Sequence, residues 1–405
     1  MRNVSEAVRR TLERPLASYQ LLYGTTALLL GIGLIMVLSA SSVYALTNTG
    51  SSFSIFLRQL IFAVLGVIGA TIASRMPLPL LRRLILPFLL VSVALIAATF
   101  IPGVGLERNG NRNWLPLFAG FQLQPSEFAK LALVLWIADL YARRQKYLGT
   151  PRYVLTPMVP VAGVVGMLVV LQHDLGTAVV IFAVTVGMLW IAGLPRRHMW
   201  GILAFLFVGL LFAVANSPHR VQRFLNFTNP EADPDSAGFQ AIHGMMALAR
   251  GGFWGVGLGN SRQKWGGRLP EAHTDFILAV LGEELGLLGT LVVLMLFILL
   301  GFAGIRVAMR TRDPFVRYAA SGITIWLLIQ AVINIGMVLG LLPVIGIPLP
   351  LVSYGGSSLM VTLTALGILI NCATTEPGAK RALEASRATR KRSAAPARVR
   401  VAGRR

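Results

Sequence analysis

Hydrophobic residues fall in long runs along most of the chain, and short polar segments separate these runs. A run of about 20 apolar residues allows a helix to cross the hydrocarbon core of a bilayer. The pattern predicts ten spans, at 21–46, 53–74, 80–101, 126–142, 154–171, 175–194, 198–216, 275–305, 318–342 and 352–373. Because 55% of residues are hydrophobic and only 13% are charged, whereas about a quarter are charged in soluble domains, the predicted fold class is an all-α polytopic membrane protein.

Lysine and arginine residues gather in alternate segments between the predicted spans. The basic segments are 2–14, 75–83, 143–152, 196–197, 306–317 and the tail after 373. Short cytoplasmic loops carry an excess of Lys and Arg, so we expect these segments and both termini in the cytoplasm. Topology thereby explains the net charge of +21 without a nucleic-acid partner. The single cysteine, Cys372, excludes an internal disulfide and a cysteine-based metal site.

The pattern divides the chain into three parts. A cytoplasmic N-terminal segment, 1–20, is followed by the ten-span region, 21–373, and by a basic tail, 374–405, that is predicted to be disordered. One large extracytoplasmic loop, 217–274, connects the seventh and eighth spans. Loops of this length commonly carry function, so the loop is a candidate part of any site.

The large loop combines a predicted amphipathic helix at 239–248 with glycine-rich turns at 251–259. It also carries cations on the face where few are expected: Arg220, Arg223, Arg250, Arg262, Lys264 and Arg268. Arginine and lysine bind phosphate oxygens well, so Arg220 and Lys264 are predicted to contact an anionic head group. The alternative is that these cations pair with acidic residues of the same loop and hold it together.

Ionisable residues gather where the large loop meets the eighth span: Glu271, His273, Asp275, Glu283 and Glu284. Asp275 is predicted at the start of a helix, where backbone amides keep a carboxylate ionised. An ionised carboxylate facing a basic loop could act as general base for a hydroxyl, although it could instead cap the helix. Glu271 and His273 are candidate substrate-binding residues, and Glu283 is a candidate supporting residue.

A second polar set surrounds the start of the fourth span. Arg112 and Trp114 precede it, and Trp114 could lie in an interfacial aromatic belt or stack on a sugar. Glu127 and Lys130 are three residues apart, so they can pair on one helix face. Such a pair either stabilises the bundle or belongs to a polar site, and both readings stay open.

Two tight turns complete the set of candidates. In the turn at 172–177, Asp174 is expected to cap the following helix, in preference to an acid–base pair with His173. In the turn at 349–358, glycines and serines allow close packing, and Ser353 is a candidate supporting residue.

Taken together, these motifs resemble the SEDS family (shape, elongation, division and sporulation proteins), which are peptidoglycan polymerases. The resemblance covers about residues 20–373, and its motifs are 109–114, 124–130, 172–177, 251–259, 269–286 and 348–358. The stretch 269–286 is more similar to the division branch, and 346–350 to the elongation branch. One departure is Asn113, which stands between Arg112 and Trp114 where the family often has an adjacent Arg.

The resemblance implies a ten-span fold in the bacterial cell membrane that polymerises lipid II into β-1,4 glycan strands. The family's essential aspartate falls on Asp275, which would take the proton from the acceptor's 4-hydroxyl during inversion at the donor C1. Departure of undecaprenyl pyrophosphate would need cations from Arg, Lys or a divalent metal, Mg²⁺ or Mn²⁺. No organic cofactor and no protein-only metal site are expected.

The resemblance also implies a class B penicillin-binding protein transpeptidase as partner, together with divisome proteins. Its membrane helix is expected on spans eight and nine, near Met337 and Gly340. Three alternatives to a division polymerase stay open: an elongation-type polymerase, a lipid II flippase or transporter, and a non-catalytic scaffold that recruits a transpeptidase. A flippase would need polar groups through the midplane, whereas the charged groups here gather at the predicted outer end.

Overall fold

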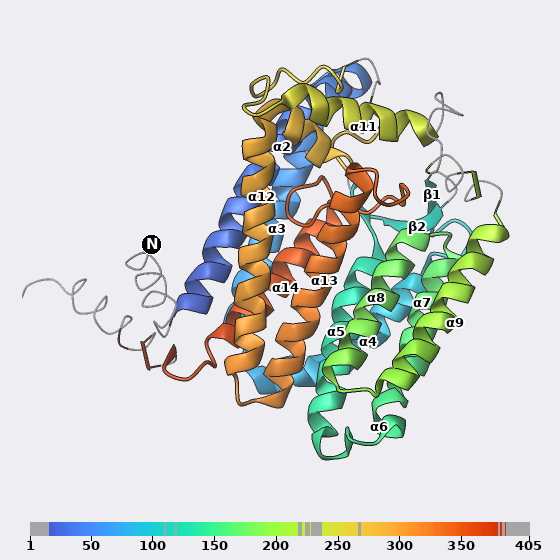
Figure 1. Cartoon of the computed structure of the whole chain (residues 1–405), viewed down its shortest axis with the longest axis vertical. Coiled ribbons are helices and arrows are strands. Elements are labelled where there is room, and N and C mark those ends of the chain that lie inside the picture. The colour runs from blue at the N-terminus through green and yellow to red at the C-terminus, as the bar shows by residue number, and fades with distance from the viewer. Residues whose placement is uncertain are drawn as a thin grey trace, which may run out of the picture.

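The computed structural model describes residues 16–108, 111–117, 120–217, 221–222, 227, 237–265, 269–379, 381–382 and 385. Long helices run side by side through most of this part of the chain (Figure 1). The main helices are α2 (Ala17–Thr49), α3 (Ser54–Arg75), α4 (Leu78–Ala98), α5 (Pro125–Arg143), α6 (Pro151–Leu155), α7 (Met158–Leu171), α8 (Leu175–Ile191), α9 (Arg196–Ala215), α11 (Ala237–Gly251), α12 (Ile277–Arg310), α13 (Pro314–Val338) and α14 (Ser357–Ala373).

Each predicted span contains a helix, and the fifth span is divided into α6 and α7. Within the described residues, seven helical segments are long and apolar enough to cross a membrane, and α8 and α14 are shorter apolar helices. The shortness of α14 corrects one boundary, because the tenth span was expected to begin at 352. The backbone turns sharply at Gly356, where φ is 49°, so the helix begins only at Ser357. The architecture is that of a multi-pass membrane protein.

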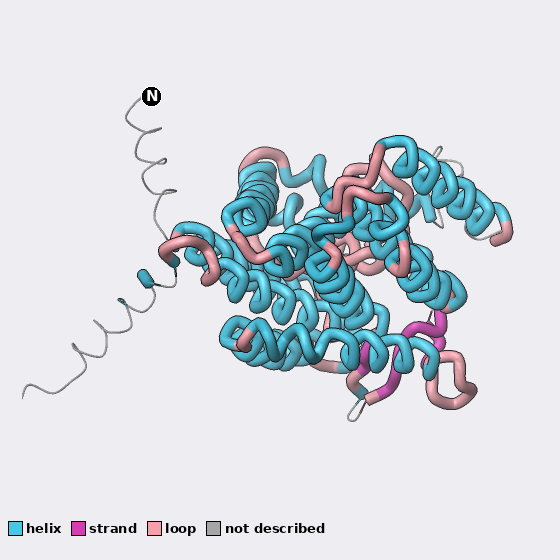
Figure 2. Tube along the Cα trace, turned by 90° about the horizontal axis from the view of Figure 1, so that it is seen from below, coloured by secondary structure: helices cyan, strands magenta, loops and turns pink. Residues whose placement is uncertain are grey.

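Helix α13 lies at the centre of the bundle and α9 at its edge. α13 packs against α5, α8, α12 and α14, and 61% of its most apolar window is buried. In contrast, none of the residues of α9 is buried. Figure 2 shows the same bundle turned by 90°, with the helices crowded around its middle. A polar side chain on α13 is therefore held on several sides, whereas α9 offers its surface to lipid.

Helix α12 is interrupted at Gly286, whose φ of 69° and ψ of −167° are not helical. The glycine-rich turns after α11 dock against this break. The amide of Val256 donates to the carbonyl of Glu283 at 2.9 Å, and the amide of Leu287 donates to the carbonyl of Gly252 at 2.9 Å. A Cβ atom at Gly255 would lie 2.2 Å from the Glu284 carbonyl oxygen, so glycine is required there. The predicted glycine-rich turns are confirmed.

Helix α11 lies across one end of the bundle, at the same end as a small sheet (Figure 1). The antiparallel sheet has the order β1 (Leu106–Arg108), β2 (Asn111–Pro116) and β3 (Gln122–Leu123). Its registers pair Leu106 with Trp114 and Leu115 with Leu123. α11 confirms the predicted amphipathic helix. The sheet corrects the all-α prediction, because this short connection satisfies its backbone by strand pairing instead of remaining irregular.

Candidate functional site

Asp275 lies just before α12, in the connection from the large loop. The helix begins at Ile277 and its N-cap position is Phe276, so Asp275 stands one residue before the N-cap position. Its side chain is half-buried, and the position of a Cβ atom at Gly346 would lie 3.5 Å from its Oδ2. The carboxylate therefore faces the turn between α13 and α14, where any larger side chain would approach it.

The two other candidates of this segment, Glu271 and His273, differ in how far their side chains are exposed. The ring of His273 lies between two tyrosine rings, with centroids 5.3 Å from Tyr44 and 5.6 Å from Tyr354. Glu271 is exposed, has a φ of 55°, and accepts a hydrogen bond from Thr274 Oγ1 at 2.7 Å. His273 is thus packed into the bundle, whereas Glu271 is the more accessible of the two.

Two buried amides of α13, which the sequence analysis did not identify, hold the turn that faces Asp275. Asn334 Nδ2 donates to the carbonyl oxygen of Asp275 at 2.9 Å and to that of Ile347 at 2.7 Å. One helical turn away, Gln330 Nε2 donates to the carbonyl oxygen of Pro348 at 3.1 Å. Their spacing of four residues places both amides on one face of α13, which is the only sequence signal that could have found them.

The predicted pair of Glu127 and Lys130 is confirmed, with Nζ 2.8 Å from Oε1 and both side chains buried. Lys130 Nζ also donates to Gln330 Oε1 at 3.1 Å and lies 5.3 Å from the centroid of the Trp326 ring. A buried ion pair needs such additional partners to offset its desolvation. Within the described residues, Glu127 Oε2 has no hydrogen-bond partner.

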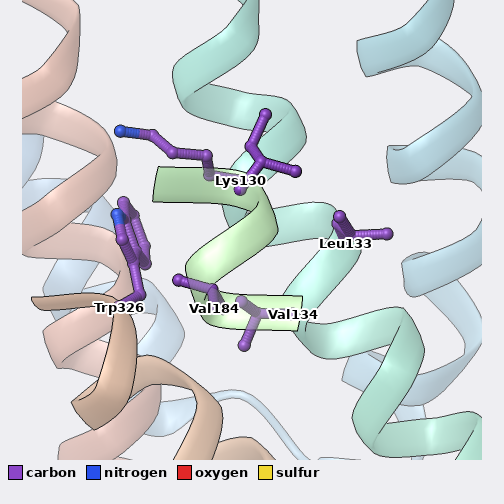
Figure 3. Close-up of a pocket in the computed structure, with 6 residues that line it drawn as sticks. Lys130, Leu133, Val134, Val184 and Trp326 are labelled. Carbon is purple, nitrogen blue, oxygen red and sulfur yellow. The ribbon is translucent and has the colours of Figure 1, made fainter. Parts of the chain in front are cut away.

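A small cavity adjoins the Lys130 side chain (Figure 3). Its volume is about 10 Å³, which is room for roughly one water molecule. The lining residues are Lys130, Leu133, Val134, Ile181, Val184 and Trp326. Apart from Lys130 and the indole this surface is apolar, so the cavity is part of the packed interior and too small for a sugar.

Glu283 and Glu284 hold the large loop against α12. Glu283 is fully buried and accepts hydrogen bonds from Ser261 Oγ and from the Arg262 amide, the latter at 3.0 Å. Glu284 pairs with Lys264, whose Nζ lies 2.8 Å from Oε1. Lys264 is itself buried. The ammonium group that was predicted to contact a substrate phosphate is therefore already paired with the Glu284 carboxylate.

The two tight turns are structural supports of the same region. Asp174 caps α8 by accepting from the Thr177 amide at 3.0 Å, as predicted, and it also accepts from Asn113 and Gln124, each at 2.8 Å. The capping aspartate thus joins the small sheet and the start of α5. Ser353 is buried, and its Oγ accepts from the Leu349 amide at 2.8 Å, which closes the turn before α14.

The remaining candidates are Arg112, Trp114 and Arg220. Arg112 pairs with Glu107 at 3.0 Å, and both side chains are 54% exposed. Trp114 is half-buried on β2. Arg220 lies outside the described residues. Among the residues that the structure describes, no three His, Cys, Asp or Glu side chains come together as a possible metal cage.

The predicted docking residue Met337 requires a correction. It was expected on an outward face, but it is buried and its Sδ accepts from the Ile345 amide at 3.3 Å. The reason is that the turn after α13 folds back over the end of the helix, where the Ile345 amide needs an acceptor. Gly340 is exposed and follows the end of the helix.

Comparison with known sequences identifies relatives over nearly the whole chain. The model of the FtsW, RodA and SpoVE family of cell cycle proteins matches residues 19–377. A protein of Mycobacterium tuberculosis named "Probable peptidoglycan glycosyltransferase FtsW" is 43% identical over 93% of this chain and 71% of its own length. Its namesake in Geobacter metallireducens is 42% identical, covering 85% and 92%, respectively. Stage V sporulation protein E of Bacillus subtilis is 40% identical, covering 85% and 94%.

Solved structures share the fold at lower identity. A chain from "Structural coordination of polymerization and crosslinking by a peptidoglycan synthase complex" is similar with a TM-score of 0.70 and 28% identity, covering 87% of this chain and 97% of that chain. The rod shape determining protein RodA of Thermus thermophilus gives a TM-score of 0.62 and 27% identity, covering 88% and 97%.

Proposed function

Because the chain belongs to the FtsW, RodA and SpoVE family of cell cycle proteins, known as SEDS proteins, we propose that it is a peptidoglycan glycosyltransferase. It polymerises lipid II into β-1,4 glycan strands, and its role is septal wall synthesis during cell division. The observation that carries this proposal is the position of Asp275, a half-buried carboxylate outside the helix that follows it. Glu283 and Glu284, farther along α12, are instead fully buried.

In the proposed reaction, the Asp275 carboxylate accepts the proton of the acceptor sugar's 4-hydroxyl as the hydroxyl oxygen attacks C1 of the donor. The new C–O bond forms as the bond from C1 to the diphosphate breaks, so the configuration at C1 inverts. Undecaprenyl pyrophosphate leaves with the bonding electrons. A positioned general base of this kind contributes about 10²- to 10⁴-fold to a rate.

The leaving diphosphate requires positive charge. The proposal includes a divalent cation, Mg²⁺ or Mn²⁺, which would neutralise that charge as the bond breaks. Magnesium usually keeps several waters and binds substrate phosphates, so the diphosphate would supply its main ligands and the Asp275 carboxylate would stay available to accept the proton. Activity of the purified protein is expected to fall on chelation with EDTA and to return with either metal.

We place the α11 end of the bundle outside the plasma membrane and the opposite end, including both termini, in the cytoplasm. The support is the distribution of Lys and Arg. Arg262 and Arg312 are exposed and lie near opposite ends of α12, while the native Cys372 is buried. An impermeant maleimide added to whole cells should label Arg262→Cys and leave Arg312→Cys unlabelled. Labelling in the reverse order would invert the topology.

The proposed partner is a class B penicillin-binding protein, with divisome proteins around the pair. Its support is the similarity to a chain of a peptidoglycan synthase complex. With Met337 buried, the docking face moves to exposed apolar residues of α12 and α13, such as Met295, Ile298 and Val332. Co-purification should be lost when Ile298 and Val332 are both changed to Lys.

The experiment that tests the proposed activity uses the purified full-length chain, fluorescently labelled lipid II and Mg²⁺. A ladder of glycan products on a gel supports the polymerase. If lipid II is unchanged with the class B partner present, the proposed activity is wrong. Transport of lipid II across vesicles without a ladder would favour the flippase.

A further inference from the structure

Asn334 occupies a position that connects two segments far apart in the sequence. It lies on the central helix α13, is fully buried, and donates both amide protons to backbone carbonyls. One belongs to Asp275 at 2.9 Å and the other to Ile347 at 2.7 Å. A side chain of this kind fixes the separation between the two backbones that it bridges.

The Asp275 carbonyl accepts this bond outside the hydrogen-bond ladder of α12. In the first turn of the helix, the amides of Ala279 and Val280 donate to the carbonyl of Phe276. The bond from Asn334 therefore ties the backbone of Asp275 to α13, at the residue whose side chain is proposed to act.

The second bond of Asn334 fixes the wall that faces the carboxylate. Ile347 directly follows Gly346, and the Cβ position of Gly346 is 3.5 Å from Asp275 Oδ2. The neighbouring Pro348 carbonyl is held by Gln330, which also accepts a hydrogen bond from Lys130. One face of α13 thus positions both the Asp275 backbone and the turn opposite its carboxylate.

We propose that Asn334 is a positioning residue, which sets the direction of the Asp275 carboxylate by holding its backbone and the turn at 345–348 in one register. This inference rests on the proposed polymerase function for its effect on rate, but the geometric part does not. Displacements of about 1 Å in a reacting group can lower a rate by roughly 10²-fold. Loss of the clamp should therefore lower kcat while leaving KM for lipid II little changed, because the Asn334 side chain is fully buried and its hydrogen bonds go to the backbone of Asp275 and Ile347.

The chain offers a matched control in Asn371 of α14. Its Nδ2 donates to the carbonyls of Ala73 at 3.0 Å and Met76 at 2.7 Å, and it is also buried. The chemistry is the same as for Asn334, but the bonds lie near the opposite end of the bundle. Asn371→Leu therefore reports the structural cost of losing two such bonds without touching Asp275.

The test compares Asn334→Leu, Asn334→Ser and Asn371→Leu in the full-length protein. Thermal unfolding, kcat and KM for lipid II, and hydrogen exchange of the amides at 274–276 and 345–349 are measured. We expect both leucine variants to lower the unfolding midpoint similarly. Only the Asn334 variants should lower kcat, by roughly 10- to 100-fold for leucine and less for serine, which retains one donor. Only they should accelerate exchange in both segments.

Equal kcat losses in Asn334→Leu and Asn371→Leu, or unchanged exchange at 345–349 in the Asn334 variants, would overturn the proposal. If Asn334→Leu does not fold, the serine variant carries the same comparison. If the wild-type chain makes no glycan even with the class B partner present, the proposed function is wrong, and the exchange measurement still decides whether Asn334 holds both segments together.

Discussion

The carboxylates at the start of α12 have opposite surroundings, although they are close in sequence. Glu283 and Glu284 are fully buried, and each accepts hydrogen bonds from the loop that covers them. Asp275 is half-buried, precedes the helix, and is held through its backbone by a neighbouring helix. A fully buried carboxylate that a substrate cannot reach stabilises structure. One whose backbone is fixed while its side chain stays accessible is arranged for chemistry.

The comparison predicts its largest effect at Asp275. In Asp275→Asn, the rate of glycan synthesis should fall roughly 10²- to 10⁴-fold, because an amide cannot accept the hydroxyl proton. The unfolding midpoint should change little, since the N-cap position of α12 belongs to Phe276. A kinetic assay with labelled lipid II and a thermal melt of the same preparation measure both quantities. Asp275→Glu should also be poor, because an added methylene displaces the oxygen toward Gly346.

At Glu284 the effect should be on stability. Glu284→Ala leaves the ammonium of Lys264 buried without its carboxylate, which costs about 3–5 kcal/mol when a buried pair is broken from one side. The midpoint of thermal unfolding in detergent should fall accordingly. Lys264→Met, which removes the charge but keeps apolar length, is the control. If adding Lys264→Met to Glu284→Ala restored most of the stability, the loss in Glu284→Ala alone would be assigned to the unpaired ammonium of Lys264.

A smaller loss of stability is expected for Glu283→Gln. The amide nitrogen would face donors, such as the Arg262 amide and Ser261 Oγ, and one mismatched buried hydrogen bond costs about 1–3 kcal/mol. Hydrogen exchange of the amides at 261–263 should increase. Glycan synthesis per folded molecule should stay within a few-fold of the wild type, and a loss as deep as that of Asp275→Asn would give Glu283 a chemical role.

The smallest structural effect is expected at Arg112. Its pair with Glu107 is exposed, and such pairs contribute about 0–1 kcal/mol, so Arg112→Ala should leave the midpoint nearly unchanged. A change in KM for lipid II in this variant can then be assigned to substrate binding and not to a loss of stability. A rise in KM for lipid II, compared with Glu107→Ala as control, would support that role, and equal KM values would remove Arg112 from the site.

The periodic parts of the fold could be predicted from the sequence because long apolar runs have one main solution in a bilayer. The apolar helices of the described residues, the Glu127–Lys130 pair and the Asp174 cap follow from apolar runs or from spacings of a few residues. The small sheet was not predicted, because its strands are only two to six residues long and lie between two strongly apolar runs.

Contacts between distant segments could not be predicted. Lys264 looked like a phosphate ligand because its partner, Glu284, belongs to the helix beneath it and not to the loop's own acidic residues. The four-residue spacing of Asn334 from Gln330 does not reveal its role, since that role depends on two carbonyls 59 and 13 residues away. Such partners are determined by tertiary packing, which neither periodicity nor local motifs encode.

The most direct test of the difference between these carboxylates is the rate of glycan synthesis per folded molecule in Asp275→Asn and Glu284→Gln, with the folded fraction taken from the thermal melt of each preparation. Glutamine can still accept from Lys264, so Glu284→Gln should work within a few-fold of the wild type per folded molecule. Asp275→Asn should be folded and nearly inactive. A folded, active Asp275→Asn, or a folded, inactive Glu284→Gln, would contradict the assignment of chemistry to Asp275 and structure to Glu284.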